Sequence, residues 1–248
     1  MRRALLIVAI LAGLAAAVVA FAPATLAAAW IARASHDAIA LAGAEGTIWR
    51  GRGTLVAGGE GRLPLAWSVD PWPLIRGEVE ISLAPFDATA PLPHGEIVMH
   101  DRTLTVRGLD VALPVEMLQQ VASGTGIRPT GEARVTSPSL DWSRDSVRGA
   151  IQIGWRDARL SAGPGAAIDL GTLSANLTGE GTDLRGPIAN EGGDVDVRGL
   201  AAWRPAGGEV SLLLTPRRPD DAATARILAA IGTPEGAGWR VVLRAGAR

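Results

Sequence analysis

The sequence predicts a mainly β protein: an N-terminal transmembrane helix, then a curved antiparallel β-sheet built as a meander of hairpins, with two short helices. Three observations predict this class. No charged residue follows Arg3 until Arg33. The rest of the chain alternates between apolar and polar residues with the period of two that strands require. Gly and Pro close the apolar runs at short intervals, which favours hairpins over βαβ crossovers.

The N-terminal segment has the length of a membrane span. A helix over Ala4–Phe21 would be about 27 Å long at 1.5 Å per residue, close to the hydrocarbon thickness of a bilayer. We therefore assign residues 1–32 to a membrane anchor, with Trp30 suited to the membrane–water interface. Arg2 and Arg3 favour a cytoplasmic N-terminus and export of the remainder. The expected location is the cell inner membrane, with a single pass and the bulk of the chain in the periplasm.

A cleaved signal peptide is the competing interpretation of this segment. An Ala-x-Ala-like site exists at Ala20-Phe21-Ala22, but Pro23 follows it and the apolar stretch is longer than a usual signal core. In both interpretations residues 33–248 are exported as an all-β domain. Two similar halves, about 38–123 and 128–248, would explain the order of predicted strands and helices. One meandering sheet would give the same order.

Strands begin soon after the anchor. The stretch Gly46–Gly77 holds short apolar patches, and its Trp49, Trp67 and Trp72 fall where a strand would carry its largest inward side chain. Clean alternation then predicts strands at Glu78–Leu83, Thr103–Arg107, Gln152–Trp155, Thr172–Leu177 and Asp194–Arg198, with a last strand over Gly238–Leu243. Interior glycines at 131, 149 and 154 mark expected bulges or bends, which favour a curved sheet.

Two stretches outside the anchor have helical patterns. Pro114–Ala122 places Val115, Leu118 and Val121 along one stripe. Pro219–Ile231 begins with a proline and two acidic residues, which suit a helix N-terminus, and ends at Gly232. We expect these two helices to cover part of the sheet edges.

Tryptophan is followed by arginine at four places, Trp49, Trp155, Trp203 and Trp239. Adjacent strand residues face opposite sides, so the simplest interpretation places Trp inward and Arg outward. The alternative is that these arginines line a ligand or partner surface. The residues predicted to be buried packing residues are Trp49, Trp67, Trp155 and Trp239.

Composition and motifs argue against an enzyme and predict no catalytic, cofactor-binding or metal residue. The chain has no cysteine, and its three histidines, His36, His94 and His100, are scattered without a zinc-type spacing. No serine lies in a nucleophile elbow, and without lysine there is no phosphate-binding P-loop. The acidic residues on alternating strand positions are interpreted as solvated: Asp141, Asp145, Asp194 and Asp196. A net charge of −1 argues against nucleic acid as a partner.

The order of several Gly-Trp blocks resembles a known family. Gly46-Thr47-Ile48-Trp49-x-Gly51, then Pro64-Leu65-x-Trp67-x-Val69 and Pro71-x-x-Leu74-Ile75-x-Gly77, look like the opening of type II secretion system protein N (GspN). Pro129-x-Gly131, Leu140-x-Trp142, Gly154-Trp155 and the closing Ile227-Leu228-x-x-Ile231-Gly232-x-Pro234 are similar too.

This resemblance implies an inner-membrane component of a machine that exports folded proteins across the outer membrane of Gram-negative bacteria. The other inner-membrane platform components of the type II secretion system would then be its partners. The resemblance implies no catalytic residues. The pattern also resembles AsmA-like periplasmic proteins. The alternative function is therefore binding or transfer of lipid in an apolar groove of the curled sheet.

Overall fold

A single antiparallel sheet dominates the computed structural model, which describes residues 20–57, 61–87, 92–115, 128–161, 167–204, 207–218 and 220–246. Within these residues the fourteen strands are β1 (Ile39–Gly46), β2 (Arg50–Ala57), β3 (Gly61–Asp70), β4 (Glu78–Pro85), β5 (His94–His100), β6 (Thr103–Pro114), β7 (Arg128–Trp142), β8 (Val147–Ser161), β9 (Ala167–Glu180), β10 (Asp183–Glu191), β11 (Val195–Arg204), β12 (Gly207–Pro216), β13 (Thr233–Glu235) and β14 (Gly238–Gly246). The helices are α2 (Ala24–Ala34), α3 (Ala222–Ile231) and the short 3₁₀ helix η1 (Pro73–Arg76).

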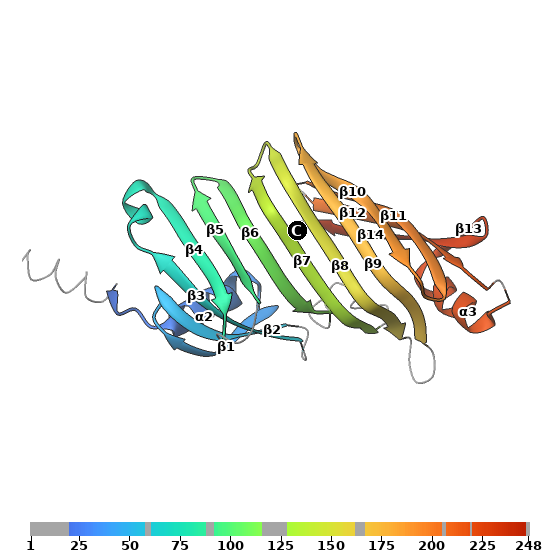
Figure 1. The fold of residues 1–248 in the computed structure, drawn as a ribbon, viewed down its shortest axis with the longest axis horizontal. Helices are drawn as coiled ribbons and strands as arrows, with labels where there is room; N and C mark the ends of the chain where they lie inside the picture. The colour runs from blue at the N-terminus through green and yellow to red at the C-terminus, as the bar shows by residue number, and fades with distance from the viewer. Residues whose placement is uncertain are drawn as a thin grey trace, which may run out of the picture.

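The strands follow one another in chain order from β1 to β12, and β14 then β13 complete the far edge (Figure 1). Every neighbouring pair is antiparallel, as a chain of hairpins requires. The predicted meander is thus confirmed. Each strand predicted from alternation is found, although the strands in the middle of the sheet are longer than the alternating runs.

The two faces of the sheet differ in polarity. Along β9, Leu173, Ala175 and Leu177 are buried on one face, while Ser174 and Asn176 are exposed on the other. Cross-strand register continues the apolar face from strand to strand, because side chains on paired residues share a face. The sheet curls so that β3 contacts β6 and β9 contacts β11 across the intervening strands. The apolar face lies inside this curl, where its side chains reach one another.

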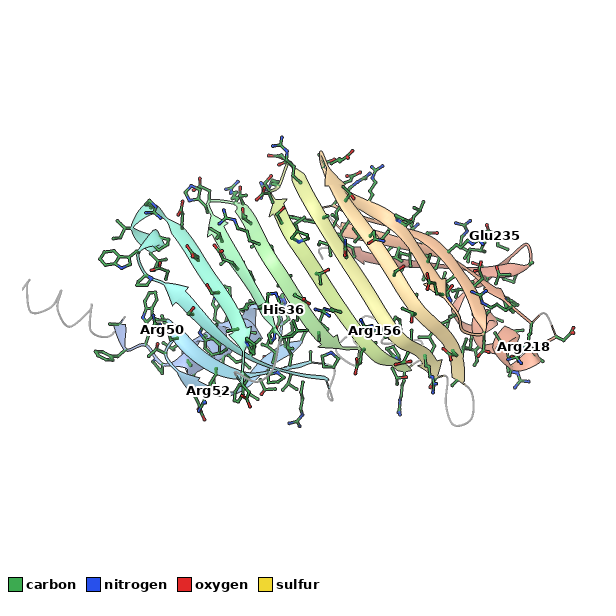
Figure 2. All side chains as sticks on the ribbon, in the orientation of Figure 1. His36, Arg50, Arg52, Arg156, Arg218 and Glu235 are labelled. Atoms are coloured by element: carbon green, nitrogen blue, oxygen red, sulfur yellow. The ribbon has the colours of Figure 1, made fainter. Side chains whose placement is uncertain are left out.

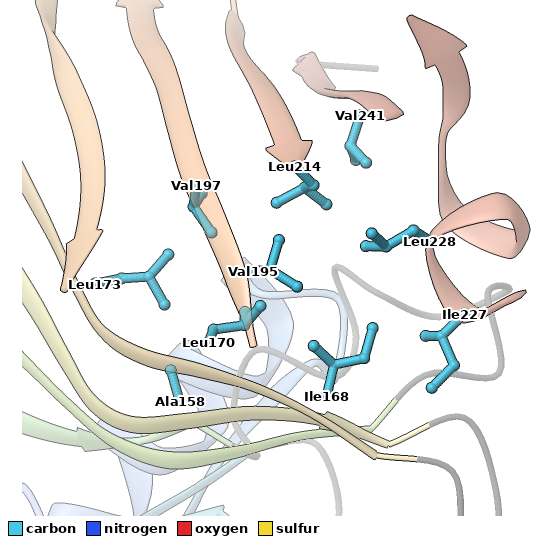
Figure 3. Close-up of a cluster of buried hydrophobic side chains, with 10 residues drawn as sticks. All are labelled: Ala158, Ile168, Leu170, Leu173, Val195, Val197, Leu214, Ile227, Leu228 and Val241. Atoms are coloured by element: carbon cyan, nitrogen blue, oxygen red, sulfur yellow. The ribbon is translucent and has the colours of Figure 1, made fainter. Parts of the chain in front are cut away.

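The main core fills the C-terminal end of the curl. Its buried residues come from β8, β9, β11, β12, β14 and α3, and Figure 3 shows them pointing toward one another: Ala158, Ile168, Leu170, Leu173, Val195, Val197, Leu214, Ile227, Leu228 and Val241. A second cluster continues this apolar face over β6 to β11.

The helix predicted over Pro219–Ile231 is found as α3, which starts at Ala222. Asp221 caps it, since its carboxylate accepts hydrogen bonds from the backbone N–H groups of Ala223 (3.0 Å) and Thr224 (3.1 Å). These bonds lower the pKa of Asp221, those from Thr224 most of all. The expectation that α3 covers an edge was wrong. Its apolar stripe packs on the sheet face, against β9, β12 and β14, because burying Leu228 there removes more apolar surface from water.

The second helix that the structure describes differs from the one predicted. Pro114 belongs to β6, and residues 116–122 of the predicted helix lie outside the described residues. Instead α2 lies within the predicted anchor and packs against β1 and β2. In the part of the chain that is described, no helix is both long and apolar enough to cross a membrane, and residues 1–19 lie outside it.

The glycines expected at bulges behave differently from one another. Gly131 has φ +122° and sits where the β7–β8 register shifts, as expected. Gly149 has φ +120°, and a Cβ there would come within 2.1 Å of the Ser139 carbonyl oxygen. Gly154 pairs regularly with Arg134 and marks no bulge. Gly131 and Gly149, the two with positive φ, help to bend the long β7–β8 hairpin.

Candidate interaction surfaces

The three histidines do not form a site. His36 lies with φ +52° in the turn after α2, while His94 and His100 stand at opposite ends of β5, about 20 Å apart at the rise of a strand. All three are exposed. His100 lies 3.9 Å from Glu78 and 3.6 Å from Asp101, in a solvated hairpin end. Among the described residues no group of three His, Cys, Asp or Glu side chains could hold a metal ion.

The outer face of the sheet is polar and carries ion pairs between neighbouring strands. Arg134 on β7 binds both carboxylate oxygens of Asp110 on β6, with its Nε 2.7 Å from Oδ1. The hydrogen bond from Arg134 holds the pKa of Asp110 below its usual range, and the same contact raises the pKa of Arg134. Arg107 on β6 makes a single contact with Glu96 on β5 at 3.3 Å. Asp110, held charged by Arg134, is poorly suited to act as a base.

The middle of this outer face is hollowed at Gly154, which has no side chain to fill the space above it. The depression has a volume of about 490 Å³, and polar side chains from β7, β8 and β9 line it, including Arg134, Arg156, Gln152 and Asn176. Figure 2 places Arg156 near the centre of the sheet, with Arg50 and Arg52 toward the N-terminal end. The depression is open and solvated, so it resembles a contact surface more than a reaction chamber.

Two of the four acidic residues interpreted as solvated, Asp194 and Asp196, are paired with arginine, and Asp141 accepts a hydrogen bond from the Thr105 hydroxyl (2.8 Å). Asp194 lies 3.0 Å from Arg218, and Asp196 lies 3.0 Å from Arg198. One carboxylate that sequence reasoning did not single out is more deeply placed. Asp183 at the start of β10 is buried and is bound by Arg185 and by Arg204. This cluster joins β10 to β11 and has a structural role.

The tryptophans predicted to be buried are half-buried, so that prediction was wrong in degree. Trp155 and Trp239 pack against the rim of the main core, whereas Trp49 lies in the bend between β1 and β2 and Trp67 lies on β3. A Cβ at Gly51 would meet the Trp67 ring at 2.3 Å, and Trp67 donates its Nε1–H to the carbonyl of Ile48 (3.1 Å). The Trp155 ring similarly lies close to Gly131. Large rings thus cover facing glycines, a pairing that sheets use to stabilise bare backbone.

Trp72 is a clear correction. The sequence pattern placed it inward on a strand, but it precedes η1 and is 72% exposed. Its neighbours Pro71 and Pro73 have no N–H group to donate to a strand ladder, so β3 ends at Asp70. Ile75, three residues later, is 78% exposed.

Another exposed apolar side chain lies beside this turn. Phe21 is 78% exposed, directly after Ala20, which lines one depression together with Pro71 and Trp72. The backbone holds this segment in place, because the Ile48 N–H donates to the Ala22 carbonyl (2.9 Å). We call Phe21, Trp72 and Ile75 the N-terminal apolar corner.

The geometry defines a class: a curled open β-sheet that offers extended surfaces and an apolar corner, with no assembled reaction centre among its described residues. Residues 37–242 match the family described as type II secretion system (T2SS), protein N. The chain therefore belongs to the type II secretion system protein N family, as the resemblance in its Gly-Trp blocks predicted. No curated protein and no solved structure matches it.

Membership gives the protein a role in type II secretion and places it in the bacterial envelope, in association with components of the secretion machinery. The family is a structural component of that machinery and is generally non-enzymatic.

Proposed function

We propose that the protein is an inner-membrane-anchored periplasmic component of the type II secretion system that supports export of folded proteins across the outer membrane. The observation that carries the proposal is the place of the family match. It starts at residue 37, directly after an N-terminal region whose first charges are Arg2 and Arg3 and whose next is Arg33. This arrangement supports a single pass with the N-terminus in the cytoplasm.

The protein acts by contact rather than turnover in this proposal. Its exported surface has a polar outer face with ion pairs between strands, and an exposed apolar corner. Such surfaces can bind partner proteins or lipid. The partners are other inner-membrane platform components of the secretion machine.

Deletion of the gene and complementation test the role. Deletion should impair export of folded substrates, and the full chain should restore it. A variant with His36, His94 and His100 all changed to Ala should restore export as well as the wild type does. Loss of export in this triple variant, with the protein folded and at normal abundance, would contradict action by contact.

Retention of the anchor has a test of its own. N-terminal sequencing of the membrane-extracted protein should find an intact N-terminus, and a mature chain that starts at or beyond Pro23 would overturn the anchor. Aspartate at Val8 and at Leu11 should weaken retention, since each charge at the centre of a membrane helix costs about 2.5–3.5 kcal/mol on insertion scales.

One observation favours a second candidate function, the binding or transfer of lipid. The apolar face of β4 and β5 is half-buried, as at Ile81 and Ile97, and so are Leu104 and Ile151 beside the second core cluster. If this face binds acyl chains, lipid should co-purify with the full chain, and deletion should alter outer-membrane lipid while secretion stays normal. Impaired secretion with no bound lipid would exclude this alternative.

A further inference from the structure

The N-terminal apolar corner combines side chains that water-exposed protein surfaces rarely gather. Phe21, Trp72 and Ile75 are each more than 70% exposed. The Ile75 N–H donates to the Trp72 carbonyl (3.2 Å), and side chains three residues apart in a 3₁₀ turn lie on the same side. Two large apolar groups therefore project together from η1, beside the segment that carries Phe21.

Packing within the chain does not explain this exposure. Pro71 before η1 and Pro73 within it already fix the turn, and Gly77 ends it in the left-handed conformation with φ +76°. A polar residue at either position would satisfy the same turn. The apolar choice therefore points to a surface that is covered when the protein is in place.

The sequence indicates which surface covers it. The chain enters the corner from residues 4–19, which carry no charge, and Phe21 is the second described residue after them. Trp favours the level of the lipid headgroups, and both Trp and Phe are typical of the apolar face of segments that lie in this region. Arg76, next to Ile75, is 67% exposed and lies 3.3 Å from Glu78. A surface pair of this kind is weak, so the guanidinium can turn toward headgroup phosphates while its stem stays apolar.

We propose that the N-terminal apolar corner is inserted in the lipid headgroup region of the membrane that holds the N-terminal segment. The β1–β4 end of the sheet then contacts the bilayer directly, and the folded domain is not held only through a flexible linker. The core around α3 and the β13–β14 edge lie at the opposite end of the sheet (Figure 1), so they project away from the membrane toward partners. This inference rests on the proposed anchoring and adds the orientation of the folded domain.

Site-specific fluorescence on the full chain tests the insertion of the corner. The chain has no cysteine, so Ile75→Cys introduces a single labelling site. The labelled protein is reconstituted in vesicles of phosphatidylethanolamine and phosphatidylglycerol. A fraction of the lipid molecules carries a nitroxide quencher on the acyl chain. A matched control is Leu200→Cys, which replaces an apolar residue that is 65% exposed on β11.

We expect the label at position 75 to emit at shorter wavelength and to be quenched severalfold more strongly than the label at position 200. Adding Trp72→Glu to Ile75→Cys should remove most of this difference, since a charge opposes insertion. Equal quenching at 75 and 200, in protein that floats with the vesicles, would overturn the insertion of the corner and leave the anchor intact. Failure of the wild-type chain to float with vesicles would overturn both.

Discussion

Replacing Leu228 with alanine tests whether α3 is an integral part of the fold. Leu228 is fully buried in the cluster that also holds Ile168, Val195 and Leu214, so α3 links strands β9, β11 and β12. The substitution removes three carbon groups, worth about 2.4 kcal/mol of transfer free energy at about 0.8 kcal/mol each. The cavity left behind adds to this, and core Leu→Ala changes cost about 2–5 kcal/mol.

We therefore expect a loss of about 3 kcal/mol in the free energy of unfolding, measured by urea denaturation. For a chain of this size the melting temperature should fall by about 6–12 °C. Hydrogen exchange should accelerate first in β9, β12 and β14, the strands that α3 contacts. Leu200→Ala is the control, because that side chain is 65% exposed. A loss below about 1 kcal/mol, indistinguishable from this control, would refute the view that α3 closes the core.

Two further predictions concern charge. Changing both Arg185 and Arg204 to Ala leaves the Asp183 carboxylate buried without a cation, which typically costs about 3–5 kcal/mol of folding stability. Because both guanidinium groups are mostly exposed, we expect a loss at the lower end of this range in urea denaturation. An unchanged denaturation midpoint would contradict the structural role of this cluster. Because Arg134 lowers the pKa of folded Asp110, this carboxylate stabilises the fold above its unfolded pKa of about 3.9, and the contribution is lost as pH falls through the folded pKa. Asp110→Asn should therefore lower stability at neutral pH and flatten its decline below about pH 4, and an unaltered acid profile would count against the pairing.

The sequence by itself determined the class of fold and most of its elements. Period-two alternation located strands such as Thr172–Leu177 because each strand has one buried and one wet face. Short Gly- and Pro-closed connections predicted the meander, since a hairpin leaves little chain for any other pairing. The helix at α3 was visible from its apolar stripe and from the acidic residues that now include the capping Asp221. The family was also recognisable from the order of the Gly-Trp blocks.

Tertiary structure decided what alternation leaves open, because a period of two says which residues share a face and not what that face meets. Curling of the sheet determined that α3 packs on the inner face instead of an edge. Strand register also placed Trp67 and Trp155, which are half-buried, against Gly51 and Gly131. Trp72, unlike Trp67, is flanked by two prolines that end the strand, and strand pairing brings it beside the segment that carries Phe21. The apolar corner exists because segments about fifty residues apart are brought together by strand pairing, a long-range event that no local pattern encodes.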